Sequence, residues 1–207
     1  IAPPLGKAAM KIGEVIMLAT NLQPFLMGIV VSVLVGAALT LPISSAAICA
    51  AFGLTGLAGG AAVAGCCAQM IGFAVMSFKE NGWGGLVSQG IGTSMLQMGN
   101  IIKNPRIWIA PIVTSAITGP VATCLFKLQM NGTAVSSGMG TCGFVGQIGV
   151  YSGWVNDVAA GTKSAITMMD WAGLILISFV LPAVICPLIN WLLKKAGWVK
   201  DGDMKLQ

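Results

Sequence analysis

The chain alternates between long apolar runs and short polar breaks, and several runs are long enough to cross a membrane. No charged residue lies between Val15 and Phe78, and further uncharged runs cover residues 107–126 and 171–193. A helix needs about 20 apolar residues to span a bilayer. These runs predict spanning helices at Asn21–Thr40, Leu54–Phe78, Ile107–Phe126 and Trp171–Leu193. The runs are continuous rather than alternating, which argues against a transmembrane β-barrel.

Shorter segments and prolines divide the chain further. Residues Lys7–Leu18 are expected to form a short amphipathic or membrane-entering helix. Pro42 interrupts the first span, and Ser44 can cap a second short helix after it, so this region forms either one kinked span or two helices. Asn104 is a plausible cap for a helix that begins at Pro105.

Composition agrees with a membrane protein. Of the 207 residues, 56% are hydrophobic and only 8% are charged, whereas a soluble domain carries about 25% charged residues. We expect an all-α, polytopic integral membrane protein with kinked helices, in which residues 1–207 form a single membrane domain. The chain begins with Ile1 rather than methionine, so it is expected to lack N-terminal helices of a longer chain. It has no dense basic patch, which argues against a nucleic-acid partner.

Six cysteines and no histidine limit the chemistry that the chain can perform. The cysteines lie mostly in apolar runs without Cys-x-x-Cys spacing, which indicates small apolar residues rather than zinc ligands. A nucleophile needs a nearby base, and without histidine only a few Lys, Asp and Glu residues remain, mostly at the ends of apolar runs. We therefore expect no metal, no cofactor and no catalytic site.

Residues Leu86–Ile102 carry a polar stripe along one side of a predicted helix. The stripe consists of Gln89, Thr93, Gln97 and Asn100, with apolar residues on the opposite side. An unpaired polar group is costly in lipid, so the stripe must face water, a cavity or another polar segment. Two interpretations remain open: a helix lying flat on the membrane, or a cavity-lining or re-entrant helix.

The stretch from Gly138 to Gly149, GMGTCGFVGQIG, is too rich in glycine for an ordinary lipid-facing helix. Glycine permits left-handed backbone and lets a ligand approach the main chain closely. Irregular backbone at membrane depth must be surrounded by protein or line a wet cavity. We expect a re-entrant loop in which Thr141 and Gln147 meet a polar ligand. An extramembrane loop and a tightly packed glycine-rich helix are the alternatives.

Two long motifs resemble the phosphotransferase-system EIIC-like membrane family: the glycine stretch, and residues 65–111, which begin GCCAQMIGFAVM. This family includes the perfringolysin O regulator proteins and proteins named as sugar-transporter IIC subunits. The resemblance implies a multi-pass protein of the bacterial inner membrane that is built like a transporter and forms a homodimer. It also implies a role in sugar transport, with any phosphorylation supplied by a separate cytoplasmic phosphotransferase partner.

Two functions follow as hypotheses. The first is a transporter that binds and translocates a small polar solute, such as a sugar, between the polar stripe and the glycine loop. The candidate solute-binding residues are Glu80, Gln89, Thr93, Gln97, Asn100, Thr141 and Gln147. Glu80 is the candidate acidic group, because IIC-type sites often use a carboxylate, and Asp170 is the second choice. The alternative is a membrane sensor or regulator that binds a ligand or partner and controls gene expression indirectly, without flux.

Overall fold

The computed structural model describes the backbone of residues 2–206 and the side chains of residues 9–206. Its α-helices are α1 (Ala2–Leu22), α2 (Pro24–Thr40), α3 (Ser45–Phe52), α4 (Gly56–Met76), α5 (Phe78–Val87), α6 (Met98–Lys103), α7 (Ile109–Pro120), α8 (Ala134–Ser137), α9 (Val145–Ala159), α10 (Met168–Ile175) and α11 (Leu181–Lys195). Three π-helical turns are η1 (Ser88–Gly92), η4 (Val121–Leu125) and η6 (Leu176–Val180), and three 3₁₀ turns are η2 (Ser94–Gln97), η3 (Pro105–Trp108) and η5 (Cys142–Phe144). The expected all-α class is confirmed.

Among the described residues, three continuous helical runs are long and apolar enough to cross a membrane. They cover Gly56–Met76, Pro105–Leu125 and Met168–Lys195, and α2 is a shorter apolar helix. The four predicted spans are therefore all helical, with shifted ends. The last run starts at Met168 because Thr167 and Asp170 form a capping box, in which each side chain bonds to the other residue's backbone N–H.

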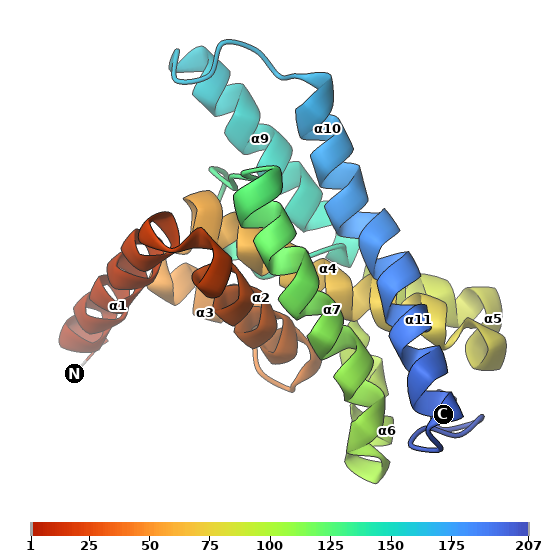
Figure 1. Ribbon diagram of the computed structural model, residues 1–207. Helices are drawn as coiled ribbons and strands as arrows, with labels where there is room; N and C mark the ends of the chain where they lie inside the picture. Colours follow the sequence, from red (N-terminus) through yellow and green to blue (C-terminus); the bar gives the residue numbers. More distant parts are fainter. Residues whose placement is uncertain (1, 207) are drawn as a thin grey trace.

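α4 lies at the centre of the molecule and packs against α2, α7 and α11 (Figure 1). Small residues allow this close packing. A Cβ atom added to Gly65 would overlap the carbonyl oxygen of Ser32 in α2, and one added to Gly60 would overlap the carbonyl oxygen of Leu128. α2 and the segment at Leu128 therefore pack with their backbones directly against α4, and small residues make such close packing possible in lipid.

The predicted breaks and caps are largely confirmed. The Ser44 hydroxyl accepts a hydrogen bond from the Ala47 N–H at 3.2 Å, so α3 is a separate helix rather than the end of a kinked span. The Asn104 side chain accepts from the Arg106 N–H at 3.2 Å and caps the turn that begins at Pro105. One interior proline of a spanning run lies beside a π-helical turn. Pro120 leads directly into η4.

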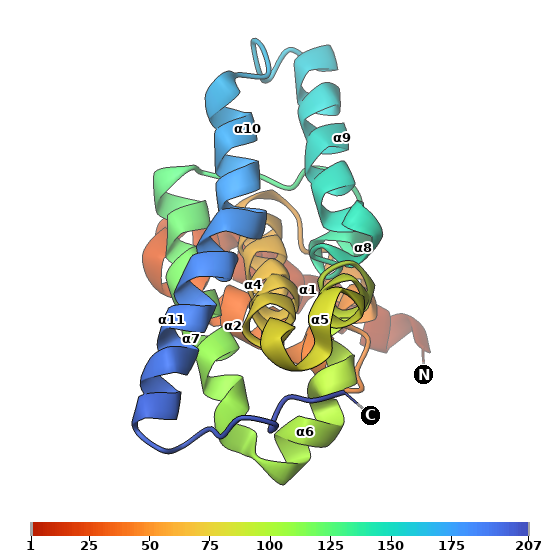
Figure 2. The same ribbon diagram turned by 90° about the vertical axis from the view of Figure 1, so that its right-hand side faces the viewer.

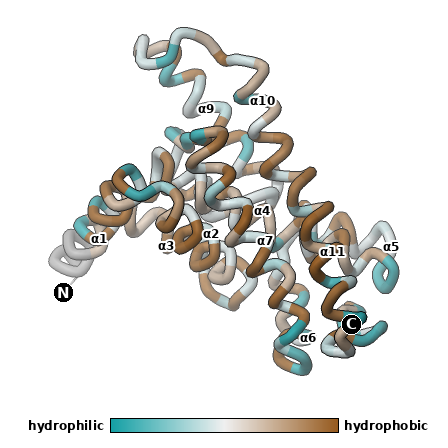
Figure 3. The backbone as a smooth tube through the Cα atoms, in the orientation of Figure 1, coloured by the Kyte–Doolittle hydropathy of each residue, from teal (hydrophilic) through white to brown (hydrophobic). Residues whose placement is uncertain are grey.

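Hydrophilic residues gather at two opposite ends of the molecule (Figure 3). One end, called the basic end below, contains α6, the start of α5 and the segment after α11. Its charged residues are Lys79, Lys103, Arg106, Lys194, Lys195, Lys200 and Lys205, with Glu80, Asp201 and Asp203. The other end, the neutral end, holds the α9–α10 connection and carries Lys127, Lys163, Asp157 and Asp170. Figure 2 shows α9 and α10 rising side by side toward it.

Candidate functional site

The polar stripe does not lie on one continuous helix. The chain forms η1, then becomes extended at Thr93 (φ −159°, ψ 141°), and then forms η2 and α6. The Thr93 hydroxyl accepts a hydrogen bond from the Met95 N–H at 3.1 Å and caps η2. The prediction of one helix over Leu86–Ile102 is therefore wrong, because Thr93 begins a new turn instead of continuing the stripe.

The other three residues of the stripe form a buried hydrogen-bonded chain. The Gln97 amide donates to Gln89 Oε1 at 2.8 Å, and the Asn100 amide donates to Gln97 Oε1 at 2.8 Å. Gln89 in turn donates to the Ser77 hydroxyl at 2.9 Å. Gln89 and Gln97 are 0% exposed and Asn100 is 8% exposed. This polar face points into the protein, so a helix lying flat on the membrane is not what forms.

The same polar chain binds residues 198–206, which we call the strap segment. This segment leaves α11 and passes along the basic end toward α6 (Figure 2). Gln97 donates to the Met204 carbonyl at 3.0 Å, and Glu80 Oε2 accepts from the Met204 N–H at 2.9 Å. The nearest basic partner of Glu80 is Lys194, at 3.8 Å, rather than its neighbour Lys79.

The glycine stretch is irregular and packs directly on α4. Gly140, Gly143 and Phe144 have positive φ values of 52°, 52° and 58°. A Cβ atom on Gly140 would lie 2.7 Å from the Cβ of Cys66, so the loop approaches α4 closely only because that position is glycine. The stretch is therefore not a continuous glycine-rich helix.

Thr141 joins this irregular stretch to the broken polar segment. Its hydroxyl is fully buried and donates to the carbonyl of Gly90, in η1, at 2.5 Å. A π-helical turn and a left-handed turn thus meet at one hydrogen bond against α4, a contact we call the junction. Broken helical hydrogen bonding in the protein interior leaves backbone groups to be satisfied by such side chains.

Gln147 lies in the first turns of α9 and has an unused hydrogen-bond acceptor. Its amide donates to the Cys67 sulfur at 3.3 Å. Its Oε1 atom is buried and has no partner among the described residues, and the residue as a whole is only 9% exposed. Ser178, in η6, lies beside Cys67, and its hydroxyl is also fully buried without a partner in the described part of the chain. Sequence reasoning did not identify Ser178. The signal that could have identified it is a single serine within the otherwise apolar run LILISFVLP, residues 174–182.

The candidate residues therefore form two groups. Glu80, Gln89, Gln97 and Asn100 lie together around the strap segment, whereas Thr141 and Gln147 lie at and beside the junction. The two groups meet at adjacent residues, because Gln89 belongs to the first group and Gly90 accepts the hydrogen bond from Thr141 of the second. Gln97 and Gln147 share no hydrogen-bond partner and so belong to different groups.

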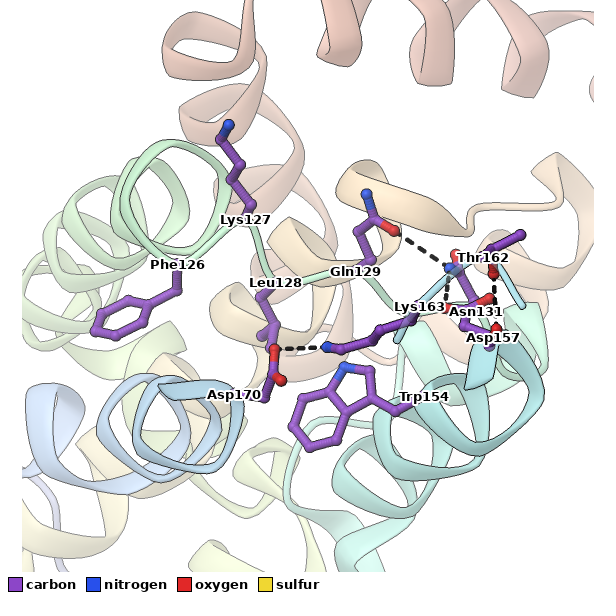
Figure 4. A pocket seen from close by; sticks show the side chains of 10 residues that line it. All are labelled: Phe126, Lys127, Leu128, Gln129, Asn131, Trp154, Asp157, Thr162, Lys163 and Asp170. Atoms are coloured by element: carbon purple, nitrogen blue, oxygen red, sulfur yellow. Dashed lines mark hydrogen bonds and ion pairs between the residues drawn. The ribbon is translucent and has the colours of Figure 1, made fainter. Parts of the chain in front are cut away.

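A separate polar cavity of about 450 Å³ opens at the neutral end (Figure 4). It is lined by Phe126, Lys127, Leu128, Gln129, Asn131, Trp154, Asp157, Thr162, Lys163 and Asp170. Lys163 pairs with Asp170 at 2.6 Å, and the Asn131 amide donates to Asp157 at 2.7 Å. Asp170 is thus both a helix cap and half of an ion pair. Sequence reasoning named only Asp170 from this cavity, because the rest comes from residues 126–131, from α9 and from residues 162–163, whose meeting has no local signal.

A family model described as "Phosphotransferase system, EIIC" matches residues 1–206. The chain belongs to this family. Membership confirms the resemblance carried by the two motifs, and an EIIC chain is a transporter-like integral membrane protein, typically the transport component and not itself catalytic. Comparisons with curated proteins and with solved structures give no match.

Proposed function

We propose that this EIIC chain binds and translocates a small polar solute, with a sugar as the expected class. The observation that carries the proposal is the junction, where Thr141 bonds to the Gly90 carbonyl between two interrupted segments. Discontinuous helices that meet inside a membrane domain are a recurring setting for solute sites in transporters, because their freed backbone groups can contact the solute.

Unused hydrogen-bonding atoms beside the junction support this site. Gln147 Oε1 and Ser178 Oγ are buried without partners among the described residues, and an unsatisfied buried polar group costs about 1–3 kcal/mol. A polyhydroxylated solute would supply hydroxyl donors and acceptors for both. We therefore place Thr141, Gln147 and Ser178 in the solute site, and we propose that residues 138–144 form a re-entrant loop.

The charge distribution supports an orientation. The basic end carries seven Lys or Arg residues and three acidic ones, whereas the neutral end carries two of each. Cytoplasmic loops of membrane proteins are enriched in Lys and Arg. We propose that the basic end faces the cytoplasm of a bacterial cell, where a phosphotransferase partner would act, and that the cavity near Trp154 faces outward. A homodimer and the bacterial inner membrane remain proposals from the family resemblance.

A sensor or regulator without flux is the second candidate function. The observation that favours it is the occupation of Gln97 and Asn100 by the strap segment, because these amides then offer nothing to a passing solute. In that case a ligand would alter the position of the strap segment and no solute would cross.

Uptake and binding in proteoliposomes test the proposal. The probes are ¹⁴C-labelled glucose, mannitol and galactitol, and the variants are Gln147→Leu and, as a control with the same substitution, Gln23→Leu. Gln23 is exposed and makes no side-chain capping bond. We expect uptake of at least one probe by the unmodified protein and by Gln23→Leu, and a loss of about tenfold or more in Gln147→Leu.

The outcomes separate the two functions. Binding of a probe without uptake favours the sensor. If none of the three probes is bound or taken up, or if Gln147→Leu transports as well as the control, the solute site proposed here is wrong.

A further inference from the structure

The strap segment is held mainly through its main chain. Besides the two bonds of Met204 to Glu80 and Gln97, the Asn81 amide donates to the Met204 carbonyl at 2.8 Å. Asn81 Oδ1 accepts from the Leu206 N–H at 2.8 Å. The main-chain groups of Met204 and Leu206, at the end of the turn over residues 201–204, are thus paired with amide and carboxylate side chains.

Further bonds fasten the strap segment to α6. The Asn100 amide donates to the Lys205 carbonyl at 3.0 Å, and the Asn104 amide donates to the Asp203 carboxylate at 2.8 Å. The segment therefore connects the start of α5 to both ends of α6, across the extended break at Thr93. It ties together two pieces that the chain itself joins only through an irregular turn.

Two apolar side chains, Met204 and Val199, anchor the segment. Met204 is 0% exposed and packs in a cluster with Phe73, Ile101 and Ile107, to which Val199 also contributes at 2% exposed. The adjacent residues are less embedded. A cavity of about 400 Å³ lies between α6 and the strap segment, lined by Asn104, Gly202 and Lys205 among others. The segment thus rests on a few fixed points rather than along its whole length, the condition for local release without unfolding of the bundle.

The side chains that hold the strap segment are the polar groups that the broken segment would otherwise present to water. Gln97 and Asn100 each use their amide nitrogen on the strap backbone, and Glu80 Oε2 is used in the same way. While the segment is docked, these groups are buried and occupied. When it leaves, they face the basic end of the molecule.

We propose that the strap segment is a releasable latch that covers this polar face, and that its release exposes Gln97 and Asn100 to water at the basic end. In transport, the latch would act as the gate on the cytoplasmic side, and this role rests on the transport function proposed above. The docked state is the closed state, in which the chain's own peptide groups occupy Glu80, Gln97 and Asn100 and cover the polar face on the side of the basic end.

Thiol accessibility tests the latch without any knowledge of the solute. The reporter is Asn100→Cys, and the probe is the small water-soluble reagent MTSET, applied to reconstituted protein. Met204→Asp introduces a charge at the buried anchor and should release the segment, while Lys205→Asp introduces the same residue at an exposed neighbouring position. Unmodified protein corrects for reaction at the six native cysteines.

We expect MTSET to react with the reporter about tenfold or more faster in the Met204→Asp background than in the Lys205→Asp background. Deletion of residues 203–206 is the second variant if Met204→Asp does not fold. Amide hydrogen exchange in unmodified protein should also show protection at Met204 and Leu206, whose N–H groups are held by Glu80 and Asn81.

Equal reaction rates in the two backgrounds, or unprotected amides at Met204 and Leu206, overturn the latch. Faster labelling after release, combined with no uptake of the three labelled sugars and polyols by any variant, supports the latch and refutes transport. Uptake with unchanged labelling refutes the latch and leaves transport standing.

Discussion

The same substitution at two buried glutamines should lower stability at one position and leave it nearly unchanged at the other. Gln97 and Gln147 are both buried, but only Gln97 is fully used. It donates to Gln89 and to the Met204 carbonyl and accepts from Asn100. Gln147 makes one bond, to the Cys67 sulfur, and keeps an unpaired carbonyl oxygen. Replacement by leucine therefore removes a satisfied network at one position and an unsatisfied atom at the other.

The structure sets the expected magnitudes. Gln97→Leu removes three hydrogen bonds, but only Gln89 Oε1 is left without a partner, at a cost of about 1–3 kcal/mol. The Met204 carbonyl keeps its bond from Asn81 and the Asn100 amide keeps its bond to Lys205, so each of these two losses costs about 0.5–1.5 kcal/mol. We therefore expect a loss of about 3 kcal/mol in total. Gln147→Leu loses a weak bond to sulfur and removes a buried orphan oxygen, so we expect a change within about 1 kcal/mol of zero, or a gain.

Thermal unfolding in detergent, followed by the fluorescence of the six tryptophans, checks the difference. For a chain of this size about 3 kcal/mol corresponds to a fall in Tm of about 6–12 °C for Gln97→Leu. The Tm of Gln147→Leu should stay within about 3 °C of the unmodified protein. Similar losses in both variants would refute the distinction between an occupied network and a spare acceptor.

Three further predictions concern other parts of the fold. Gly65→Ala should lower stability by about 3 kcal/mol or prevent folding, because the new Cβ overlaps the Ser32 carbonyl. Gly99→Ala, with nothing within 4 Å, should be neutral or slightly stabilising, and detergent Tm values compare the two. Thr141→Val should cost about 1–3 kcal/mol in the same assay by leaving the Gly90 carbonyl without its donor, whereas Thr141→Ser should not; equal losses would argue against that bond. The Lys194 ammonium donates a hydrogen bond to Asp201 and holds the pKa of that carboxyl below its usual value. The pair therefore contributes its full stabilisation of the fold above about pH 5, and this stabilisation is lost as the pH falls through the lowered pKa. Because Asp201 is exposed, Asp201→Asn should change Tm by less than about 2 °C at pH 7, and a larger shift would show that the pair matters more than its exposure allows.

The membrane-spanning elements were predictable because lipid imposes a simple rule. Uncharged runs such as residues 107–126 and 171–193 must be helical, since no other local structure satisfies the backbone in lipid. Local side-chain chemistry also revealed the caps at Ser44 and Asn104. Family membership followed from two motifs that span much of the chain.

The site was less predictable because its contacts are not local. Periodicity placed Thr93 on a helical stripe, although its hydroxyl instead caps a new turn. Nothing in the sequence indicated that Gln97 and Asn100 would bond to the main chain of Met204 and Lys205 more than 100 residues later. Main-chain acceptors have no residue signature, so a docked segment of this kind is visible only in three dimensions.

Because the strap segment is held largely by its peptide groups, some of its side chains have no part in docking. Val199, Met204, Asp201, Asp203 and Trp198 do take part, through burial, ion pairing, hydrogen bonding or stacking under Arg106. Lys200 and Lys205 are exposed and make no side-chain bond among the described residues, so these two positions are open to drift during evolution without loss of docking. They are also sites where an epitope or a fluorophore could be attached to report whether the segment is seated.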